Sequence, residues 1–317
     1  MDHNLLGQLE QQLVNGLTLG SVYAIIALGY SMVYGILEML NFAHGEVFMI
    51  GSFVGWGVLQ LFLHAGGAGF GGLAVSANPV IIIVLMLLAA MAATSLLGVG
   101  VEYFAYRPLR KAQRLAPLIT ALAISILLQN VVMLTMGARS KVYATQVLLP
   151  MDWRLHLGSA DVSLIRILVV GVNILLMLAL DTFIRRTRLG KAMRATAQDR
   201  EAASFLGIDV DRVISATFLI GSALAGAGGV LVGLYYTQID FFMGFGAGMK
   251  AFTAAVLGGI GNVRGAMLGG LILGLAESLG TAFISPVYKD VIAFSLLIVL
   301  LIFRPSGLLG EKVQVKV

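Results

Sequence analysis

The chain has 317 residues, of which 59% are hydrophobic and only 12% are charged, against about 25% charged in an average soluble domain. It contains no cysteine, which excludes disulfide bridges and thiolate metal sites. The formal net charge is +5, but the basic residues are gathered in short segments between long apolar runs. That distribution is typical of membrane-protein loops and disfavours a nucleic-acid-binding surface.

Nine apolar runs follow one another along the chain, and several have the 18 or more residues that cross a bilayer. They lie at 11–36, 41–63, 79–104, 117–136, 163–184, 214–236, 248–262, 265–283 and 288–303. The run at 248–262 is short and interrupted by glycines, so it is either a crossing or a re-entrant segment shielded by protein. We expect an all-α, polytopic membrane bundle of about eight or nine transmembrane segments, broken or re-entrant near 36–46 and 258–265.

The basic residues set the expected orientation, because cytoplasmic loops carry the excess of lysine and arginine. The basic clusters lie at 107–114, 185–212 and 304–316. Nine crossings from an external N-terminus put all of them in the cytoplasm together with the C-terminus, and leave 64–78 and 137–162 outside. No polar stretch is long enough for a soluble domain, so residues 1–317 are expected to form one transmembrane domain.

Residues 185–213 form a basic, polar segment in the middle of this apolar chain. Thr196 followed by Asp199 resembles a helix-start capping box, and Gly207 is a typical helix stop. We therefore expect a ten-residue helix from Ala197 to Leu206, about 15 Å long and too short to span a bilayer. Its small and apolar side chains suit a shallow cleft in a partner, although a solvated amphipathic connector explains the same pattern.

Polar side chains also stand at the head of an apolar run, at Asn41, His44 and Glu46. Ionisable groups inside a membrane helix are costly and are functional candidates. These residues either line a translocation path or cap a helix at the cytoplasmic interface, where a helix N-terminus would stabilise Glu46. The second candidate for a path or gate is the glycine-rich turn made of Gly258, Gly259, Gly261 and Asn262.

Two segments in different halves of the chain are similar: Phe42-Ala-His-Gly45 and Phe245-Gly-Ala-Gly248 each open a helix that becomes glycine-rich. Many transporters contain paired broken helices that line a pathway at the membrane midplane, although a match this short also arises by chance. Small residues spaced four apart predict close helix packing in lipid. These pairs are Gly16/Gly20, Ala223/Ala227 and Gly270/Gly274.

Motifs for chemistry are missing from the sequence. It has no G-x-x-x-x-G-K-[ST] phosphate loop, so transport energy must come from a partner that binds ATP or from an ion gradient. It also lacks a G-x-S-x-G elbow and an H-E-x-x-H metal motif. We expect a chain that is not an enzyme and that binds no cofactor and no metal.

Glu201-Ala202-Ala203, followed four residues later by Gly207, resembles the EAA loop of ABC-importer permeases. From residue 11 onward the chain is similar to the LivH-type permeases of branched-chain amino-acid importers. The stretches that carry this resemblance are Asn15-Gly-Leu-Thr-Leu-Gly-Ser21, Gly29-Tyr-Ser-Met-Val-Tyr-Gly35, Asn41-Phe-Ala-His-Gly-Glu46, Gly258-Gly-Ile-Gly-Asn262 and Phe303-Arg-Pro-Ser-Gly-Leu-Leu309.

The resemblance implies a permease subunit in a bacterial inner membrane that passes leucine, isoleucine, valine and other neutral amino acids inward by alternating access. The implied partners are a second related permease, two cytoplasmic ATPase subunits and an extracytoplasmic substrate-binding protein. The implied contacts with the ATPases are Glu201, Ala202, Ala203, Phe205, Leu206 and Gly207. Two alternatives stay open: the same architecture importing urea or a short amide, and an ion-coupled secondary transporter.

Overall fold

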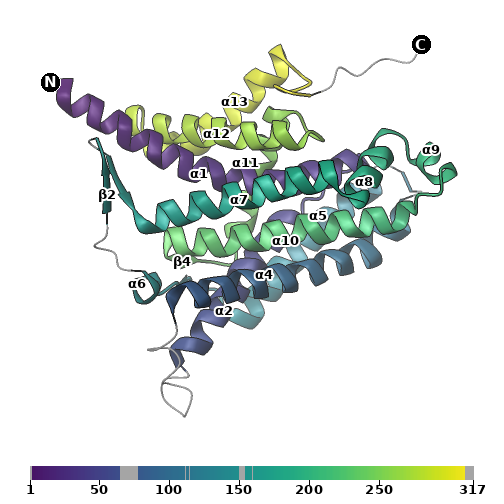
Figure 1. Ribbon diagram of the computed structural model, residues 1–317, viewed down its shortest axis with the longest axis horizontal. Helices are drawn as coiled ribbons and strands as arrows, with labels where there is room; N and C mark the ends of the chain where they lie inside the picture. The colour runs from purple at the N-terminus through teal and green to yellow at the C-terminus, as the bar shows by residue number, and fades with distance from the viewer. Residues whose placement is uncertain are drawn as a thin grey trace.

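The computed structural model describes residues 2–64, 78–110, 112–113, 115–149, 154–158 and 160–310. Most of the expected external segment 64–78 therefore lies outside the described residues, as do Lys111, Arg114, Lys312 and Lys316 of the basic clusters. Within the described part, the chain is a bundle in which most of the long helices run side by side (Figure 1).

Eight segments of the described chain are long and apolar enough to cross a membrane, which confirms the expected polytopic all-α fold. They belong to α1 (Asp2–Leu37), α2 (His44–His64), α4 (Pro79–Val101), α5 (Leu115–Met136), α7 (Leu164–Arg186), α10 (Val210–Tyr236), α12 (Val263–Phe283) and α13 (Lys289–Phe303). Four helices are shorter: α6 (Thr145–Leu148), α8 (Arg188–Gln198), α9 (Arg200–Phe205) and α11 (Met243–Gly258). Helix α4 continues through a π-helical turn (Glu102–Tyr106) and a 3-10 turn (Arg107–Leu109), and another 3-10 turn (Pro286–Tyr288) precedes α13.

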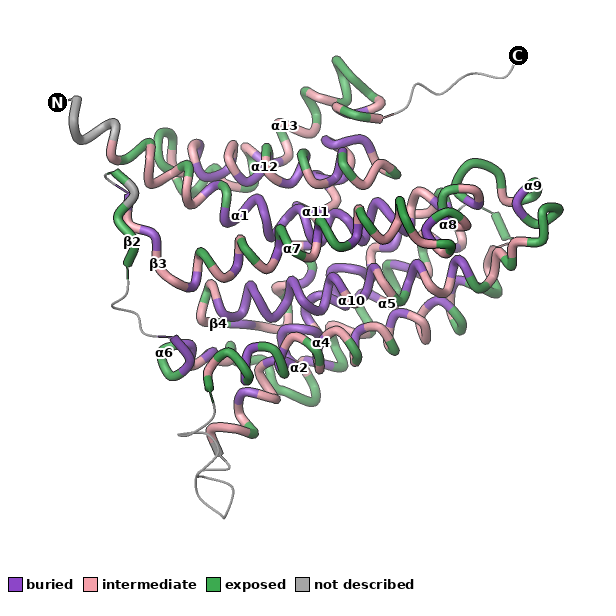
Figure 2. The backbone as a smooth tube through the Cα atoms, in the orientation of Figure 1, coloured by how far each residue is buried: buried purple, intermediate pink, exposed green. Residues whose placement is uncertain are grey.

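Helices α1 and α10 form the centre of the bundle. In the most apolar 18-residue stretch of each membrane span, 89% of the residues are buried in α1 and 83% in α10. The corresponding shares are 17% in α5 and 6% in the span that contains α13. Figure 2 shows the same contrast along the backbone. The exposed side chains of the outer helices are mainly leucine, isoleucine and valine, so these helices present an apolar surface to lipid or to another membrane subunit.

Glycines allow α1 and α12 to approach each other closely. Gly16 and Gly20 of α1 face Gly270 and Gly274 of α12, and a Cβ added at Gly20 would lie 2.8 Å from the Cα atom of Leu271. A Cβ added at Gly274 would meet the backbone N and Cα atoms of Gly20. The small-residue spacing predicts tight packing, which the structure confirms, and the structure identifies these two motifs as partners.

The described parts of the basic clusters meet at one end of the bundle. Arg107, in the turn after α4, pairs with Asp211 at the start of α10 at 2.6 Å. The Leu308 amide donates to the Leu257 carbonyl at 2.9 Å, which joins the residues after α13 to the end of α11. The N-terminal part of α1 lies at the opposite end from α8 and α9 (Figure 1). The clusters therefore share one side, as the charge pattern predicts.

The described part of segment 137–162 covers the opposite end. Strand β1 (Lys141–Val142) pairs antiparallel with β4 (Gln238–Ile239), and β2 (Arg154–Leu157) pairs with β3 (Ala160–Ser163). The hydroxyl of Tyr143 donates to the Ser52 carbonyl of α2 at 2.6 Å, and burial raises the pKa of Tyr143 well above its ordinary value. The segment is thus tied to both α2 and α10.

Arg110 should contribute strongly to stability, because it bonds to the fully buried carboxylate of Glu102. Ser215 is the other donor to this carboxylate, at 2.7 Å. We expect Arg110→Gln to lower the free energy of unfolding by about 2 kcal/mol, since it leaves a buried charge without its counter-ion. Equilibrium unfolding in mild detergent measures the change. Combining it with Glu102→Gln should recover much of the loss, and a double variant as unstable as Arg110→Gln would contradict this account.

Candidate functional site

The polar segment between α7 and α10 folds into two helices, where the sequence predicts one. Asp199 accepts hydrogen bonds from the amides of Glu201 and Ala202, both at 2.9 Å, and starts α9. Thr196 was expected to start the helix but is buried inside α8. The predicted start is therefore wrong, and α9 has six residues instead of ten. The physical reason is that an Asp side chain is a strong N-cap by itself and does not need the Thr196 partner.

Helix α9 presents an apolar end to its surroundings. Phe205 is 84% exposed and Leu206 is 81% exposed, whereas Ala203 is buried against the rest of the protein. Gly207 has a φ of +81°, and the Ile208 amide donates to the Ala203 carbonyl, so the helix stops at Gly207 as predicted. Two large apolar side chains standing together at a polar end of the bundle are typical of an interaction site.

The α8–α9 unit is fastened to the central helix. Arg200 Nε donates to the Ile36 carbonyl at the end of α1, at 2.8 Å. Partial burial lowers the pKa of the Arg200 guanidinium, with the Glu38 carboxylate acting in the opposite direction. Because the unit is also continuous with α7 and α10, a force applied to α9 can be transmitted to three of the long helices.

Asn41, His44 and Glu46 are all buried inside the bundle. Asn41 Oδ1 accepts a hydrogen bond from the Tyr106 hydroxyl at 2.9 Å. Glu46 Oε1 accepts one from the Ser125 hydroxyl at 3.2 Å, near the middle of α5. His44 Nε2 and Glu46 Oε2 have no hydrogen-bond partner among the described residues. The hydrogen bonds of Asn41 and Glu46 thus lead to two different helices, through Tyr106 after α4 and Ser125 in α5, while the His44 ring packs edge-on against Tyr30 of α1 at 4.8 Å.

Helices α2 and α11 both begin in the interior of the bundle, and their first turns touch. A Cβ added at Gly248 would lie 3.0 Å from the Cα atom of Gly45. A Cβ added at Gly244 would lie 2.5 Å from Glu46 Oε2, so this carboxylate lies between two helix N-termini, whose partial positive charge stabilises it. The two similar sequence segments therefore meet in space, as paired broken helices do in many transporters.

The glycine-rich turn Gly258–Asn262 lies at the basic end of the bundle. Asn262 accepts hydrogen bonds from the amides of Arg264 and Gly265 and so starts α12, while its Nδ2 donates to the Leu309 carbonyl at 2.8 Å. The interruption that lies inside the bundle is therefore the one before α11, between Tyr236 and Met243. The glycine-rich turn after α11 instead packs against the residues that follow α13.

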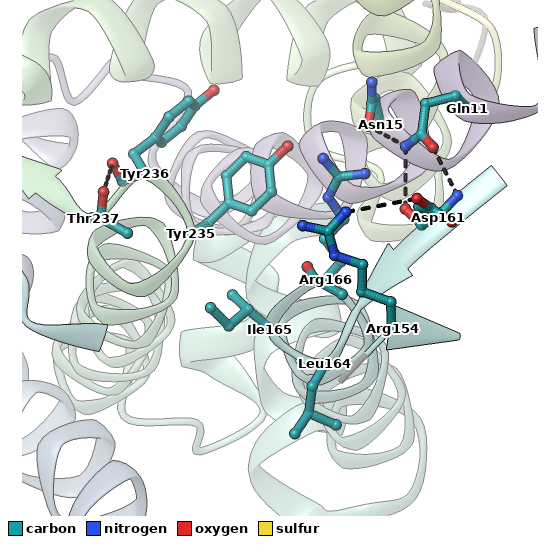
Figure 3. Close-up of a pocket in the computed structure, with 11 residues that line it drawn as sticks. Gln11, Asn15, Arg154, Asp161, Leu164, Ile165, Arg166, Tyr235, Tyr236 and Thr237 are labelled. Carbon is teal, nitrogen blue, oxygen red and sulfur yellow. Dashed lines mark hydrogen bonds and ion pairs between the residues drawn. The ribbon is translucent and has the colours of Figure 1, made fainter. Parts of the chain in front are cut away.

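Two adjoining cavities, of about 630 Å³ and about 460 Å³, open at the end opposite α9. Asn15, Arg166, Tyr235 and Tyr236 line both cavities. Figure 3 shows the Arg166 guanidinium directed toward Asn15 and Tyr235, without a marked interaction. We refer to the two cavities together as the outer chamber. Chambers of this size accommodate a small ligand.

An ion-pair network centred on the buried carboxylate of Glu277 borders the chamber. The Glu277 carboxylate is fully buried and accepts hydrogen bonds from the Tyr23 hydroxyl at 2.9 Å and from Lys250 Nζ at 3.1 Å. Lys289 Nζ lies 3.0 Å from Glu277, and Lys250 also pairs with Asp290 at 2.7 Å. The network joins α1, α11, α12 and α13, and its two acids balance its two lysines.

The profile of one family, "Branched-chain amino acid transport system / permease component", matches residues 12–301. The chain belongs to this family. It is 49% identical over 304 residues to the high-affinity branched-chain amino acid transport system permease protein LivH of Escherichia coli (strain K12), with 95% of each chain covered. It is also 49% identical, over 308 residues and 95% of each chain, to BraD of Pseudomonas aeruginosa, which has the same description.

More distant relatives come from Methanocaldococcus jannaschii. A probable branched-chain amino acid transport permease protein LivH is 30% identical to this family member, with 95% of this chain and 93% of the relative covered. A probable permease LivM is 25% identical, with 92% and 91% covered. No solved structure matches the chain.

Sequence reasoning did not single out Arg166 in this permease. The residue is the third of α7 and lies inside the predicted apolar run 163–184. A charge within an apolar membrane run is itself a functional signal, and that signal could have found this residue. The packing of α7 against α1 and α10 directs the Arg166 side chain into the outer chamber.

Proposed function

We propose that this chain is a membrane-embedded permease subunit of an ATP-driven ABC importer for leucine, isoleucine and valine, and that it also passes other neutral amino acids. The observation that carries the proposal is the 49% identity, over nearly the whole length, to permeases of high-affinity branched-chain amino acid transport systems. The chain passes solute by alternating access and leaves ATP hydrolysis to separate subunits.

Coupling to those ATPases is assigned to α9 and the residues that follow it. The proposed contacts are Glu201, Ala202, Ala203, Phe205, Leu206 and Gly207. The exposed Phe205 and Leu206 support this assignment, because aromatic and aliphatic anchors that fill a partner's pocket provide much of the energy of an interface. The firm attachment of α9 to α1, α7 and α10 then turns movement of the partner into movement of the bundle.

The path is proposed to run between the outer chamber and the basic end, past the first turns of α2 and α11. The proposed path or gate residues are Asn41, His44, Glu46, Gly258, Gly259, Gly261 and Asn262. The assembly contains a second related permease, two ATPase subunits and an extracytoplasmic binding protein. The basic end faces the cytoplasm of a bacterial cell, and the N-terminus lies outside.

Reconstitution tests this proposal. The intact assembly in liposomes should take up radiolabelled leucine when ATP is enclosed with the ATPases and the binding protein is added on the other side. The same liposomes given labelled urea should accumulate none. The isolated chain should not accumulate leucine under any ion gradient, since its energy comes from its partners. Leucine accumulation by the isolated chain that an uncoupler abolishes would replace the proposal with an ion-coupled transporter.

A further inference from the structure

The outer chamber contains a cation that the protein does not neutralise. Arg166 forms no ion pair with any described residue, and its buried Nη1 atom has no hydrogen-bond partner among them. The other charges at the chamber are paired. Arg154 lies 3.6 Å from Asp161, and Glu277 is held by two lysines. The described lining therefore carries one uncompensated positive charge at Arg166.

The Arg166 side chain is partly buried, with its Nη1 atom enclosed by the protein. A guanidinium nitrogen that loses hydration without gaining a counter-charge is costly. Its planar fork of donors matches the two oxygens of a carboxylate. An anionic group on a bound ligand would offset this desolvation cost by pairing with the guanidinium. The chamber thus has the electrostatics of a site for a monoanionic group.

The rest of the lining fits the remainder of a small zwitterion. Tyr235 and Tyr236 line the chamber with Arg166, and their ring centroids are 4.9 Å apart. Leu19 of α1 and Ile165 of α7 add aliphatic wall. The one fully buried acid at the chamber, Glu277, is already occupied by Tyr23, Lys250 and Lys289, so it does not provide a free anion for an ammonium group. Recognition is therefore strongest at the carboxylate.

We propose that Arg166 is the binding residue in the outer chamber for the carboxylate of the amino acid being transported. This inference rests on the proposed import of amino acids and deepens it. Arg166 reads the group that all α-amino acids share, while the tyrosine and aliphatic walls tolerate different side chains. An uncharged amide such as urea lacks the group that Arg166 binds.

The test uses the full assembly of permeases and ATPases in nanodiscs, without the binding protein. Saturation-transfer NMR should detect leucine and give a signal for leucinol, which lacks the carboxylate, that is weaker by about tenfold or more. Arg166→Gln should remove this difference, Arg166→Lys should restore part of it, and Arg139→Gln, on an exposed outer loop away from the chamber, should leave it unchanged.

A stability measurement separates binding from a structural role. Because Arg166 is unpaired, Arg166→Gln should keep or raise the melting temperature of the assembly, whereas loss of a structural ion pair would lower it. Equal signals for leucine and leucinol in the unmutated assembly would overturn the proposal. So would an Arg166→Gln assembly that still distinguishes leucine from leucinol but binds the binding protein more weakly in a separate measurement, because Arg166 would then pair with a carboxylate of that protein. If the unmutated assembly did not transport leucine, the proposed function would be contradicted, which is a different result from loss of carboxylate recognition by Arg166.

Discussion

Replacing both Phe205 and Leu206 with aspartate is expected to abolish ATP-driven uptake and to weaken the attachment of the ATPase subunits by about 1000-fold. Both side chains are more than four-fifths exposed at the end of α9. Anchors of this kind contribute about 2 kcal/mol or more each to an interface, and a carboxylate in an apolar pocket adds a desolvation cost. Co-purification of the ATPases with tagged permease measures the attachment.

The fold of the permease should survive this change, because neither side chain packs against the rest of the chain. The matched control is Leu155→Asp, an exposed apolar residue on β2 at the opposite end, and this variant should retain the ATPases. Normal ATPase recovery and normal uptake with both aspartates in place would remove α9 from the coupling mechanism.

Introducing valine at Gly274 is expected to prevent the bundle from folding, with a loss of more than about 3 kcal/mol in the free energy of unfolding. The atoms that a Cβ would meet there belong to the backbone of Gly20, on the central helix α1. Unlike a flexible side chain, a backbone cannot move aside, so the two helices must separate along their length. The yield of monodisperse protein and its melting temperature in detergent measure the loss.

Gly171→Val is the matched control for the packing prediction. Gly171 lies in the middle of α7, and a Cβ added there meets nothing within 4 Å. This variant should therefore be recovered at the usual yield, with a change of no more than about 0.5 kcal/mol, as is common for surface substitutions. Similar behaviour of the two variants would show that α1 and α12 do not depend on their glycine contact.

The three parts of the proposed transport machinery lie at different levels of the bundle. The outer chamber is at one end, the interior starts of α2 and α11 lie between the ends, and α9 is at the other end. Helices α1 and α10 connect all three levels, since each contributes to the chamber and to the core and has its other end near α8 and α9. A rocking movement of these helices offers one route from ATP binding to opening of the chamber.

The sequence alone predicts much of this arrangement. The length and apolarity of the runs predict a polytopic helical bundle, and the concentration of arginine and lysine predicts which loops share a side. The Glu201-Ala202-Ala203 stretch with its glycine stop predicts a short helix where α9 is found. The exact start of that helix could not be predicted, because capping by Asp199 and continuation of α8 through Thr196 both fit the local sequence.

The sequence alone did not predict which helices contact each other. The small-residue motifs at Gly16/Gly20 and Gly270/Gly274 were recognisable, but nothing local states that they pack on each other. The meeting of Gly45 with Gly248 was suggested only by a four-residue similarity. Composition and spacing therefore determined that this chain crosses a membrane and where it turns. Tertiary structure alone decided that Arg166 remains unpaired while Glu277 is neutralised, because the balance of charge in a buried site depends on residues brought together from helices far apart in the chain.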